Sequence, residues 1–334
     1  MAIKILTVGP LTTVQDLGRS GFGSRGYRRC GACDKYSMQI ANILAGNMEN
    51  CALAAVLEFT LSGGKMEFAD NCQIALTGAD MSPILNGNPI AMYRSVKAKA
   101  GDILELGMAV DGLRTYLAVG GGIDTEKVMG SRATDCTCGI GGMDGRAIRE
   151  GDVLKTGVPG KEKVEFAITD EMFWLKKPSY PYRSVGNQLL PVLRVVAGPQ
   201  EEAFTEAARE SLRRGVYKIK VDSDRMAVRL EGPELKTKEG CDIISDGIVE
   251  GSVQISSNGL PMVMLADHQT TGGYAKIATV ISTDIPAIAQ RRPGECIGFE
   301  YITPAEAGEA YRKEVRKLVW LKKEIVMRQK NRKW

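Results

Sequence analysis

Short segments in which apolar and polar residues alternate run through most of the 334-residue chain. Glycine, aspartate, asparagine or proline ends nearly all of them, and this two-residue periodicity predicts short β-strands joined by turns. The 38 glycines are consistent with many tight turns. Clear examples are KILTV (4–8), QIALTG (73–78), TYLAVGG (115–121), VLRVVAG (192–198) and KIATVI (276–281).

Helical periodicity is confined to three segments, residues 34–46, 199–215 and the tail 311–334. This is not the strand–helix alternation of a doubly wound sheet, so we expect a mainly-β architecture of barrels or sandwiches. Three segments share a turn glycine, an acid and an outgoing strand, which suggests duplicated barrel modules. They are AGDILELG (100–107), EGDVLKTG (150–157) and PGECIGFEYI (293–302). The proline-rich segment 176–191 is the predicted linker.

The composition is that of an ordinary soluble globular protein, with 44% apolar and 25% charged residues. The sequence has no apolar run long enough to span a membrane and begins without a signal peptide pattern, so we expect a cytoplasmic protein. The net charge of +4 is uneven, because residues 311–334 carry +8 and the rest of the chain −4. We expect this basic tail to pack as a helix through one apolar stripe. A tail that binds a membrane surface or RNA is the alternative.

Eight cysteines are scattered along the chain, and Cys30, Cys33, Cys136 and Cys138 form the pairs CGAC and CTC. Together these pairs could supply four thiolates to a zinc ion or a cluster, although CxC is not the usual spacing. We favour small buried residues over a metal site. The glycine-rich segment 130–146 also carries charged side chains, which is typical of a functional loop.

Several familiar catalytic patterns are missing from the sequence. The motif GxxxxGK[ST] is absent, so no nucleotide site can be recognised. His268 is the only histidine, which excludes HExxH, and no GxSxG elbow accompanies it. Asp80 directly follows a predicted strand and is either a turn acid that caps local N–H groups or a charged group at a barrel mouth.

The segment LADHQTTGGYAKIATV (265–280) is the richest in chemistry. We expect Asp267 at the end of a strand, a turn over 268–273 with Gly272 and Gly273 allowing close approach, and a strand that places Tyr274 and Lys276 on one face. Asp267 and Lys276 could then pair across a hairpin. These groups suit a small planar amide or carboxylate and proton transfer. A tight hairpin with an exposed salt bridge is the alternative.

The chain resembles the biotin-dependent carboxyltransferase-like family, which includes the C subunit of 5-oxoprolinase, KipA, allophanate hydrolase subunit 2 and the carboxyltransferase domain of urea carboxylase. The segments that carry the resemblance occur in order from residue 13 to 280. They are TVQDLGRSGF (13–22), GACDKYSMQIANILAGN (31–47), LEFTLSGG (57–64), ALTGAD (75–80), GLRTYLAVGGGI (112–123), GSRATD (130–135), GGMDGR (141–146), GPQ (198–200), SDRMAVRLEGP (223–233), SDGIVEGSVQI (245–255) and ADHQTTGGYAKIATV (266–280).

The resemblance implies a mainly β protein of two cyclophilin-like β-barrel domains, with a few helices, a C-terminal helix and a site between the barrels. We assign the first barrel to residues 1–180, the second to 181–303 and a basic helix to 304–334. The resemblance also implies two partners, a B subunit that is KipI-like or allophanate hydrolase subunit 1-like, and an A subunit. With them the chain, as the C subunit, would open 5-oxoproline to L-glutamate at the expense of ATP, whose site would lie on, or be shared with, the partner.

The family signature is similar to Asp-x-Gln-Thr-Thr-Gly-Gly-Tyr-x-Lys, with His268 on a variable position, so we treat this histidine as incidental. The resemblance implies catalytic roles for Asp267, Lys276 and Tyr274. Asp16 also matches a family position. The substrate-binding candidates are Gln269, Thr270, Thr271, Gly272, Gly273, Arg132, Asp80, Gln15, Arg19, Arg225 and Gln254.

Two other functions stay open at this point. One is biotin-dependent carboxyl transfer to urea or a related amide, and the other is a KipA-type regulatory protein that binds a kinase inhibitor. The chain departs from the family at Cys33 and at Cys136 and Cys138, where relatives usually carry other residues, and at Met143, where His or Tyr is commoner. The cysteine departures keep the metal alternative open.

Overall fold

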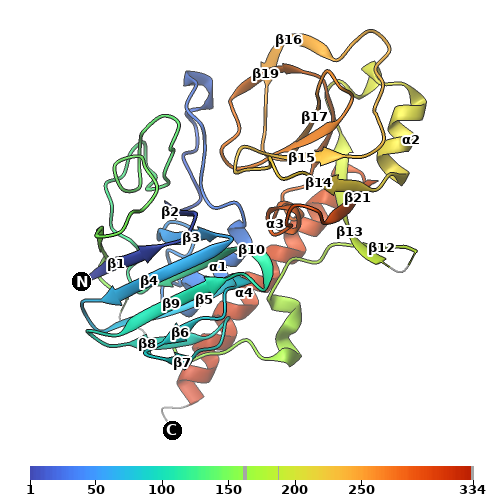
Figure 1. The fold of residues 1–334 in the computed structure, drawn as a ribbon. Helices are drawn as coiled ribbons and strands as arrows, with labels where there is room; N and C mark the ends of the chain where they lie inside the picture. The colour runs from blue at the N-terminus through green and yellow to red at the C-terminus, as the bar shows by residue number, and fades with distance from the viewer. Residues whose placement is uncertain (161–163, 187, 332–334) are drawn as a thin grey trace. The chain divides into compact units, whose positions relative to one another are not determined.

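A computed structural model describes residues 1–160, 164–186 and 188–331 of the chain. The described residues divide into two compact units, each visible as a separate group of strands in Figure 1. The first unit contains residues 1–20, 30–177 and the C-terminal part from Val315, and the second contains 21–29 and 178–314. The assignment of domains to 1–180, 181–303 and 304–334 stays a prediction.

The first unit is built from two antiparallel sheets. Its strands are β1 (Ala2–Val8), β2 (Leu11–Gln15), β3 (Val56–Thr60), β4 (Ser62–Phe68), β5 (Cys72–Asp80), β6 (Ile84–Leu85), β7 (Asn88–Pro89), β8 (Ser95–Ala98), β9 (Ile103–Met108), β10 (Asp111–Val119) and β11 (Val153–Lys155). The strand order is β11-β1-β4-β9-β6-β7 in one sheet and β2-β3-β10-β5-β8 in the other. Buried side chains from both sheets, among them Phe68 and Leu104 from the first and Phe59 and Leu117 from the second, form one core.

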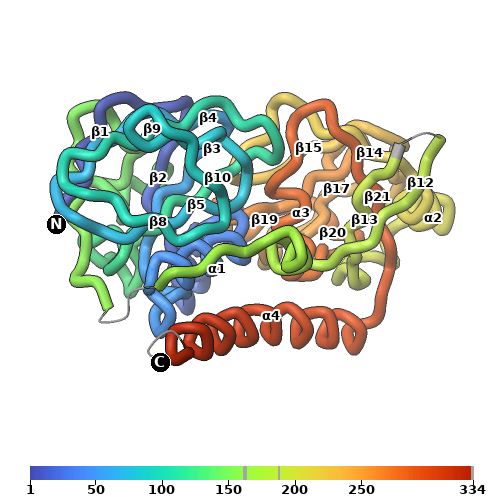
Figure 2. The backbone as a smooth tube through the Cα atoms, turned by 90° about the horizontal axis from the view of Figure 1, so that it is seen from below, coloured from blue at the N-terminus to red at the C-terminus, as the bar shows by residue number. Residues whose placement is uncertain are grey.

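Helix α1 (Lys35–Leu44) covers the β5–β10 side of the first unit. Asp34 caps it, because its carboxylate accepts a hydrogen bond from the backbone N–H of Ser37 at 2.8 Å. A second core of this unit joins α1 to Tyr116 of β10 and to Leu321 and Ile325 of helix α4 (Pro304–Asn331). Figure 2 shows α4 as the long red helix near the C-terminus. The helix also contacts the short 3₁₀ turn η2 (Asp170–Leu175) through Trp320, whose ring meets that of Trp174 edge-on.

The expected packing of the basic tail is therefore confirmed, with one correction to its stripe. The apolar stripe predicted from helical spacing consists of Val315, Leu318, Val319, Leu321, Ile325 and Val326. Leu321 and Ile325 are fully buried, whereas Val315 and Val319 are exposed. Residues 332–334 of the predicted helix lie outside the described residues. Among the residues that are described, no helix is both long and apolar enough to cross a membrane.

Truncating Leu321 to alanine should destabilise the protein by about 2–5 kcal/mol, because it removes a fully buried side chain from the core between α4 and α1. The matched control is Val319→Ala on the same helix, where the side chain is 44% exposed and little packing is lost. Urea unfolding followed by circular dichroism measures both. Equal stability of the two variants would contradict the packing described for α4.

In the described part of the second unit, seven strands close into a barrel. The strands of this unit are β12 (Tyr182–Val185), β13 (Gln188–Ala197), β14 (Tyr217–Ile219), β15 (Ala227–Glu231), β16 (Asp242–Gly247), β17 (Ser252–Ile255), β18 (Pro261–Met264), β19 (Thr271–Tyr274), β20 (Lys276–Val280) and β21 (Cys296–Tyr301). The ring runs β13-β20-β17-β18-β15-β14-β21, and β21 closes it by pairing in parallel with β13. Strand β12 extends β13, and β16 pairs with β19 as a separate ribbon.

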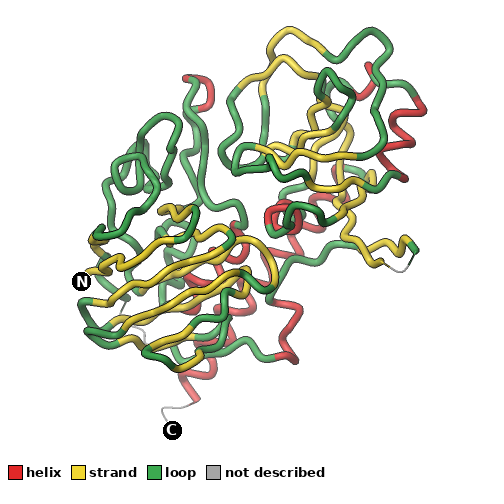
Figure 3. The backbone as a smooth tube through the Cα atoms, in the orientation of Figure 1, coloured by secondary structure: helices red, strands yellow, loops and turns green. Residues whose placement is uncertain are grey.

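Apolar side chains from every strand of the ring fill the barrel, including Leu193, Val263 and Phe299. Helix α2 (Glu206–Arg214) contributes Ala208 and Leu212 to this core, and the short helix α3 (Ile285–Ala289) contributes Ile288. Figure 3 shows how little of the chain is helical. The structure thus confirms the mainly-β prediction.

Two details of the predicted elements are corrected. The segment predicted as one helix over 199–215 is a 3₁₀ turn η3 (Glu201–Ala203) and α2, separated by Phe204, whose extended backbone breaks the helix. Part of the predicted linker 176–191 is β12, which pairs with β13. The three similar turn–strand segments do have one geometry. Gly101, Gly151 and Gly294 all have positive φ angles, and each is followed by a strand, β9, β11 or β21.

Candidate functional site

The segment 265–280 connects strand β18 to strand β20 of the barrel in the second unit and differs in detail from the predicted hairpin. Strand β18 ends at Met264, and Asp267 stands in the turn that follows, where its N–H donates to the carbonyl of Arg225 at 2.9 Å. Gly272 and Gly273 belong to strand β19, not to a turn. A Cβ at Gly272 would lie 2.7 Å from Cδ1 of Ile248, so glycine is needed here for contact within the protein.

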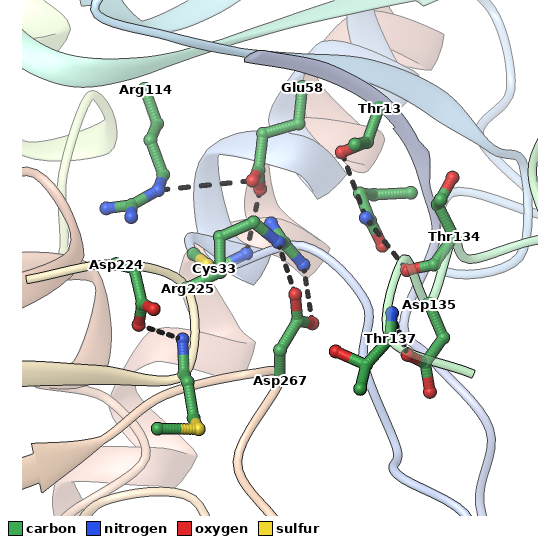
Figure 4. Close-up of polar contacts among 12 residues, drawn as sticks. Thr13, Cys33, Glu58, Arg114, Thr134, Asp135, Thr137, Asp224, Arg225 and Asp267 are labelled. Carbon is green, nitrogen blue, oxygen red and sulfur yellow. Dashed lines mark hydrogen bonds and ion pairs between the residues drawn. The ribbon is translucent and has the colours of Figure 1, made fainter. Parts of the chain in front are cut away.

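Asp267 is held by a guanidinium. The Nε and Nη2 atoms of Arg225 donate to Oδ2 and Oδ1 of Asp267 at 2.8 and 3.0 Å (Figure 4). Arg225 is 7% exposed and Asp267 20%. This bidentate geometry fixes the plane of the carboxylate, while the partial exposure leaves it within reach of a small molecule. Asp267 and Arg225 were both sequence candidates, and the structure brings them together.

Lys276 has a different partner from the one predicted. Its side chain is 2% exposed, and Nζ donates to Oδ2 of Asp246 at 2.8 Å. The predicted pairing of Lys276 with Asp267 is therefore wrong. The reason is the register of the ribbon, in which Asp246 of β16 lies opposite Gly272 of β19. This register brings Asp246 to the start of β20, next to Lys276, so Asp246 takes the place predicted for Asp267.

Gln200 completes this group, which we call the lysine cluster (Lys276, Asp246 and Gln200). Its Oε1 accepts from the backbone N–H of Lys276 at 3.1 Å, and its Nε2 donates to Oδ2 of Asp246 at 3.1 Å. Hydrogen bonds from Lys276 and then from Gln200 hold the pKa of Asp246 below its ordinary value of 3.8. Neither Gln200 nor Asp246 was a candidate, although both lie in the segments GPQ and SDG that carry the resemblance.

The other candidates of this segment make local contacts. Gln254 is buried on β17 and donates through Nε2 to the carbonyl of Tyr274 at 3.3 Å, which ties β17 to the end of β19. The carbonyl of Thr270 accepts from Ile248 N–H at 2.9 Å, and Thr271 is exposed. Oε1 of Gln269 is buried without a hydrogen-bond partner in the described structure. The ring of His268 is buried, with Nδ1 2.7 Å from the carbonyl oxygen of Gln269.

The candidates of the first unit gather where β2 meets the glycine-rich segment 130–146. Asp16 follows β2, and Oδ1 accepts from the hydroxyl of Ser131 at 2.6 Å, while Oδ2 accepts from the N–H of Arg132 at 2.7 Å. The Arg132 side chain turns away to Asp124 and donates through Nε to the carbonyl of Thr125 at 2.8 Å. Asp16 thus fixes the start of the glycine-rich segment.

Two buried side chains continue this junction. Gln15 donates through Nε2 to Oγ1 of Thr13 at 3.0 Å and to the carbonyl of Thr134 at 3.4 Å. Arg19 donates through Nη2 to the carbonyl of Ala133. Together with Asp16 these contacts define the arginine cluster (Gln15, Asp16, Arg19 and residues 131–135), which the structure assembles from segments more than 110 residues apart.

Gly142→Ala should lower the free energy of unfolding by about 1–3 kcal/mol more than Gly139→Ala does. Both glycines have positive φ, so the backbone strain is similar. Only at Gly142 would the new Cβ overlap the hydroxyl of Thr134, because Gly139 has no neighbour within 4 Å of that position. Thermal unfolding of the two variants measures the difference, and identical melting curves would contradict the close approach.

Asp80 stands apart from both clusters, on the end of β5. Its Oδ1 accepts from the N–H of Ser82 at 2.8 Å, which is the local capping contact given above as one alternative. Its part in substrate binding stays a prediction.

The two cysteine pairs differ in their surroundings. Cys30 and Cys33 are buried, and the backbone N–H of Cys33 donates to Oε2 of Glu58 at 2.9 Å (Figure 4). Cys136 and Cys138 are exposed on the glycine-rich segment. Within the described ranges, no group of three or more His, Cys, Asp or Glu side chains is arranged to hold a metal ion. The four cysteines are therefore not assembled into one site.

The chain is similar in sequence to a known protein family and to proteins with assigned names. Residues 25–301 match the family described as carboxyltransferase domain, subdomain A and B. The chain is 37% identical to the C subunit of 5-oxoprolinase from Escherichia coli over 321 residues, which cover 95% of this chain and 98% of that protein. It is 35% identical to the Haemophilus influenzae protein of the same name, with 93% and 94% covered.

A solved structure, that of the Kluyveromyces lactis urea amidolyase, superposes with a TM-score of 0.81 at 27% identity. The match covers 96% of this chain but 20% of that one. The urea amidolyase of Saccharomyces cerevisiae is 28% identical, with 89% of this chain and 16% of that protein covered. The fold is thus one that occurs both in a protein of similar length and inside much longer enzymes.

Proposed function

Because the chain belongs to the family of carboxyltransferase domains with subdomains A and B, we propose that it is the C subunit of an ATP-dependent 5-oxoprolinase. In this proposal it opens 5-oxoproline to L-glutamate together with a KipI-like B subunit and an A subunit. The observation that carries the proposal is the match to two proteins named as the C subunit of 5-oxoprolinase, over nearly their whole length and that of this chain.

The alternative function is biotin-dependent carboxyl transfer to urea or a related amide. Relatives named urea amidolyase support it, but they are 28–30% identical and the chain spans less than a fifth of their length. Biotin would be required only under this alternative. Both functions act on a planar amide, so the same polar groups would suit either substrate.

Ring opening requires that water add to the lactam carbonyl carbon, that the carbon–nitrogen bond break and that the nitrogen gain a proton. We assign the removal of the proton from water to the carboxylate of Asp267, which Arg225 orients. We assign protonation of the departing nitrogen to the ammonium of Lys276, which Asp246 and Gln200 hold. Tyr274 and Gln269 are assigned to orienting the amide.

ATP would supply the free energy by activating the amide. The described residues include no loop that we can assign to it, so the proposal places its site on the partners or shared with them and derives no step from it.

The test is made on the chain co-purified with homologues of the B and A subunits. ATP hydrolysis and glutamate release are followed with 5-oxoproline added, and stoichiometric, substrate-dependent release of both products is expected. A well-formed complex that releases no glutamate would overturn the proposal. A biotin-dependent assay with urea would then test the alternative.

Replacing Asp246 by asparagine should lower kcat/KM at neutral pH. Lys276 is 2% exposed, and its buried ammonium would lose the carboxylate that holds it. In the wild type the lowered pKa of Asp246 keeps this carboxylate ionised at neutral pH, so the pairing is lost only as the pH falls below 3.8. The pH profile of kcat/KM should therefore lie below that of the wild type throughout the range in which Asp246 is ionised.

Asp242→Asn, on the same strand and also exposed, is the matched control and should leave the pH profile unchanged. A profile of Asp246→Asn that superposes on the wild type would show that the role assigned to Lys276 does not depend on the carboxylate of Asp246.

A further inference from the structure

Buried arginines in the described part of the chain differ in how their charge is compensated. Arg19, Arg114 and Arg225 are 2%, 3% and 7% exposed. Arg225 forms the bidentate pair with Asp267, and Nε of Arg114 faces Oε1 of Glu58 at 4.0 Å (Figure 4). The Nη2 atom of Arg19 donates to the carbonyl of Ala133. Its Nε and Nη1 atoms are buried and have no hydrogen-bond partner among the described residues.

A buried guanidinium without a counter-charge is unfavourable, and arginine cannot relieve the cost by losing its proton. Neither carboxylate of the arginine cluster forms an ion pair with Arg19 in the described structure, and only that of Asp16 is engaged through both oxygens. Both oxygens of Asp16 accept hydrogen bonds from Ser131 and Arg132, and a further one comes from Gly18 N–H. Oδ1 of Asp135 accepts from the N–H groups of Thr137 and Cys138. The guanidinium of Arg19 is thus without a carboxylate partner among the described residues.

Two buried acceptors without a partner lie on the same junction. Oε1 of Gln15 and Oδ2 of Asp135 have no donor among the described residues. Arg19 contacts the carbonyl of Ala133, and Gln15 contacts the carbonyl of Thr134. Asp135 is the next residue along the chain, so the three side chains lie at the same short segment, residues 133–135. Unpaired donors and unpaired acceptors in one buried place are typical of a polar ligand site.

We propose that Arg19 binds an oxyanion, a carboxylate or phosphate oxygen of a reactant, and that Gln15 accepts an N–H or O–H group of the same ligand. The proposal rests on the proposed function, because 5-oxoproline carries a carboxylate beside its lactam N–H and ATP carries phosphates. A Cβ at Gly141 would overlap Nη2 of Arg19 and the carbonyl of Ala133. Since these residues cover the guanidinium so closely, they have to shift when the anion enters.

The test uses the full chain, alone and co-purified with its partners, and measures melting temperature and binding by calorimetry. The probes are 5-oxoproline, inorganic phosphate and 2-pyrrolidinone, which is the same lactam without the carboxylate. We expect 5-oxoproline or inorganic phosphate to bind and to raise the melting temperature. The uncharged 2-pyrrolidinone should leave the melting temperature unchanged. A shift with 5-oxoproline identifies the carboxylate as the source of the anion, and a shift with phosphate identifies the phosphate.

Arg19→Met and Arg114→Met form a matched pair of substitutions in the same unit. Arg19→Met should weaken binding of the anion at least tenfold and leave the ligand-free melting temperature equal to or above the wild-type value, because an uncompensated charge is removed. Arg114→Met should lower the ligand-free melting temperature, since buried Glu58 loses the positive charge that faces it, and should keep the anion-induced shift. Arg19→Lys, which keeps a charge, should retain part of the affinity.

Two results would overturn the proposal. One is undiminished anion binding by Arg19→Met. The other is a wild-type protein that shows no anion shift while Arg19→Met melts as low as Arg114→Met, which would identify Arg19 as a structural residue solvated by buried water. Glutamate release by the wild-type complex is measured separately, so failure of the anion site and failure of the proposed function are distinguished.

Discussion

Replacing Lys276 by methionine should reduce 5-oxoproline-dependent glutamate release by at least about 100-fold, with the complex intact. General acid catalysis by a positioned side chain contributes about 10²–10⁴-fold, and in the proposed mechanism Lys276 is the donor for the departing nitrogen. Methionine has nearly the length of the lysine stem and suits a side chain that is 2% exposed, so packing is largely kept. The measurement is kcat at saturating substrate and ATP.

Lys218→Met provides the control, because Lys218 is an exposed lysine on β14 of the same barrel. Its activity should equal that of the wild type, and both variants should co-purify with the partners and keep the wild-type circular dichroism spectrum. Wild-type activity in Lys276→Met would remove the lysine from the mechanism. If Lys276→Met no longer assembles with the partners, Lys276→Arg is tested instead. Arginine keeps the positive charge and should retain substrate binding, but it does not place a proton donor at the same position.

Exchanging Asp267 for asparagine is the second substitution with a large expected effect, again a loss of about 10²–10⁴-fold in kcat. Asparagine has the same shape and still offers one oxygen to Arg225, so the turn after β18 is preserved. It cannot take a proton from water at neutral pH, which is the role assigned to the carboxylate. Binding of 5-oxoproline should change much less than kcat.

Asp222, whose side chain is 52% exposed, provides the control. The variant Asp222→Asn tests whether removing another acid near this end of the barrel also lowers kcat. It should be fully active. If Asp267→Asn raised KM and left kcat unchanged, Asp267 would be a binding residue and the base would have to be sought elsewhere. Arg225→Lys, which cannot form the bidentate contact, should lower kcat partway and report how much orientation matters.

The mainly-β character of the protein was predictable because it rests on local physics. Alternation of apolar and polar positions determines which face of a strand can be buried, and turn glycines such as Gly101 and Gly294 determine where strands begin. The helix over 34–46 was recognisable from its helical periodicity, which is also a local property of the chain. Helix 199–215 was predicted too long, because the extended backbone of Phe204 depends on packing within the barrel core.

Some residues of the candidate site were named from the sequence, whereas the pairs they form were not. Asp267, Lys276, Arg225 and Arg19 follow from the resemblance, whereas the pairs they form do not. Lys276 pairs with Asp246 and Asp267 with Arg225, partners that are 30 and 42 residues away. The sequence offered a shorter pairing, Asp267 with Lys276, that the structure replaces. Gln200 was missed, although its segment GPQ was one of those that carry the resemblance.

The sequence by itself determined the strand-rich fold class, the family and the segment that carries most of the polar chemistry, since periodicity, turn residues and motifs are local properties of the chain. The tertiary structure alone decided which charges are compensated. The register of β16 against β19 brings Asp246 to Lys276, and the junction of β2 with residues 131–135 buries Arg19 without a carboxylate partner among the described residues. Such pairings depend on strand register and burial, which arise only when distant segments pack together.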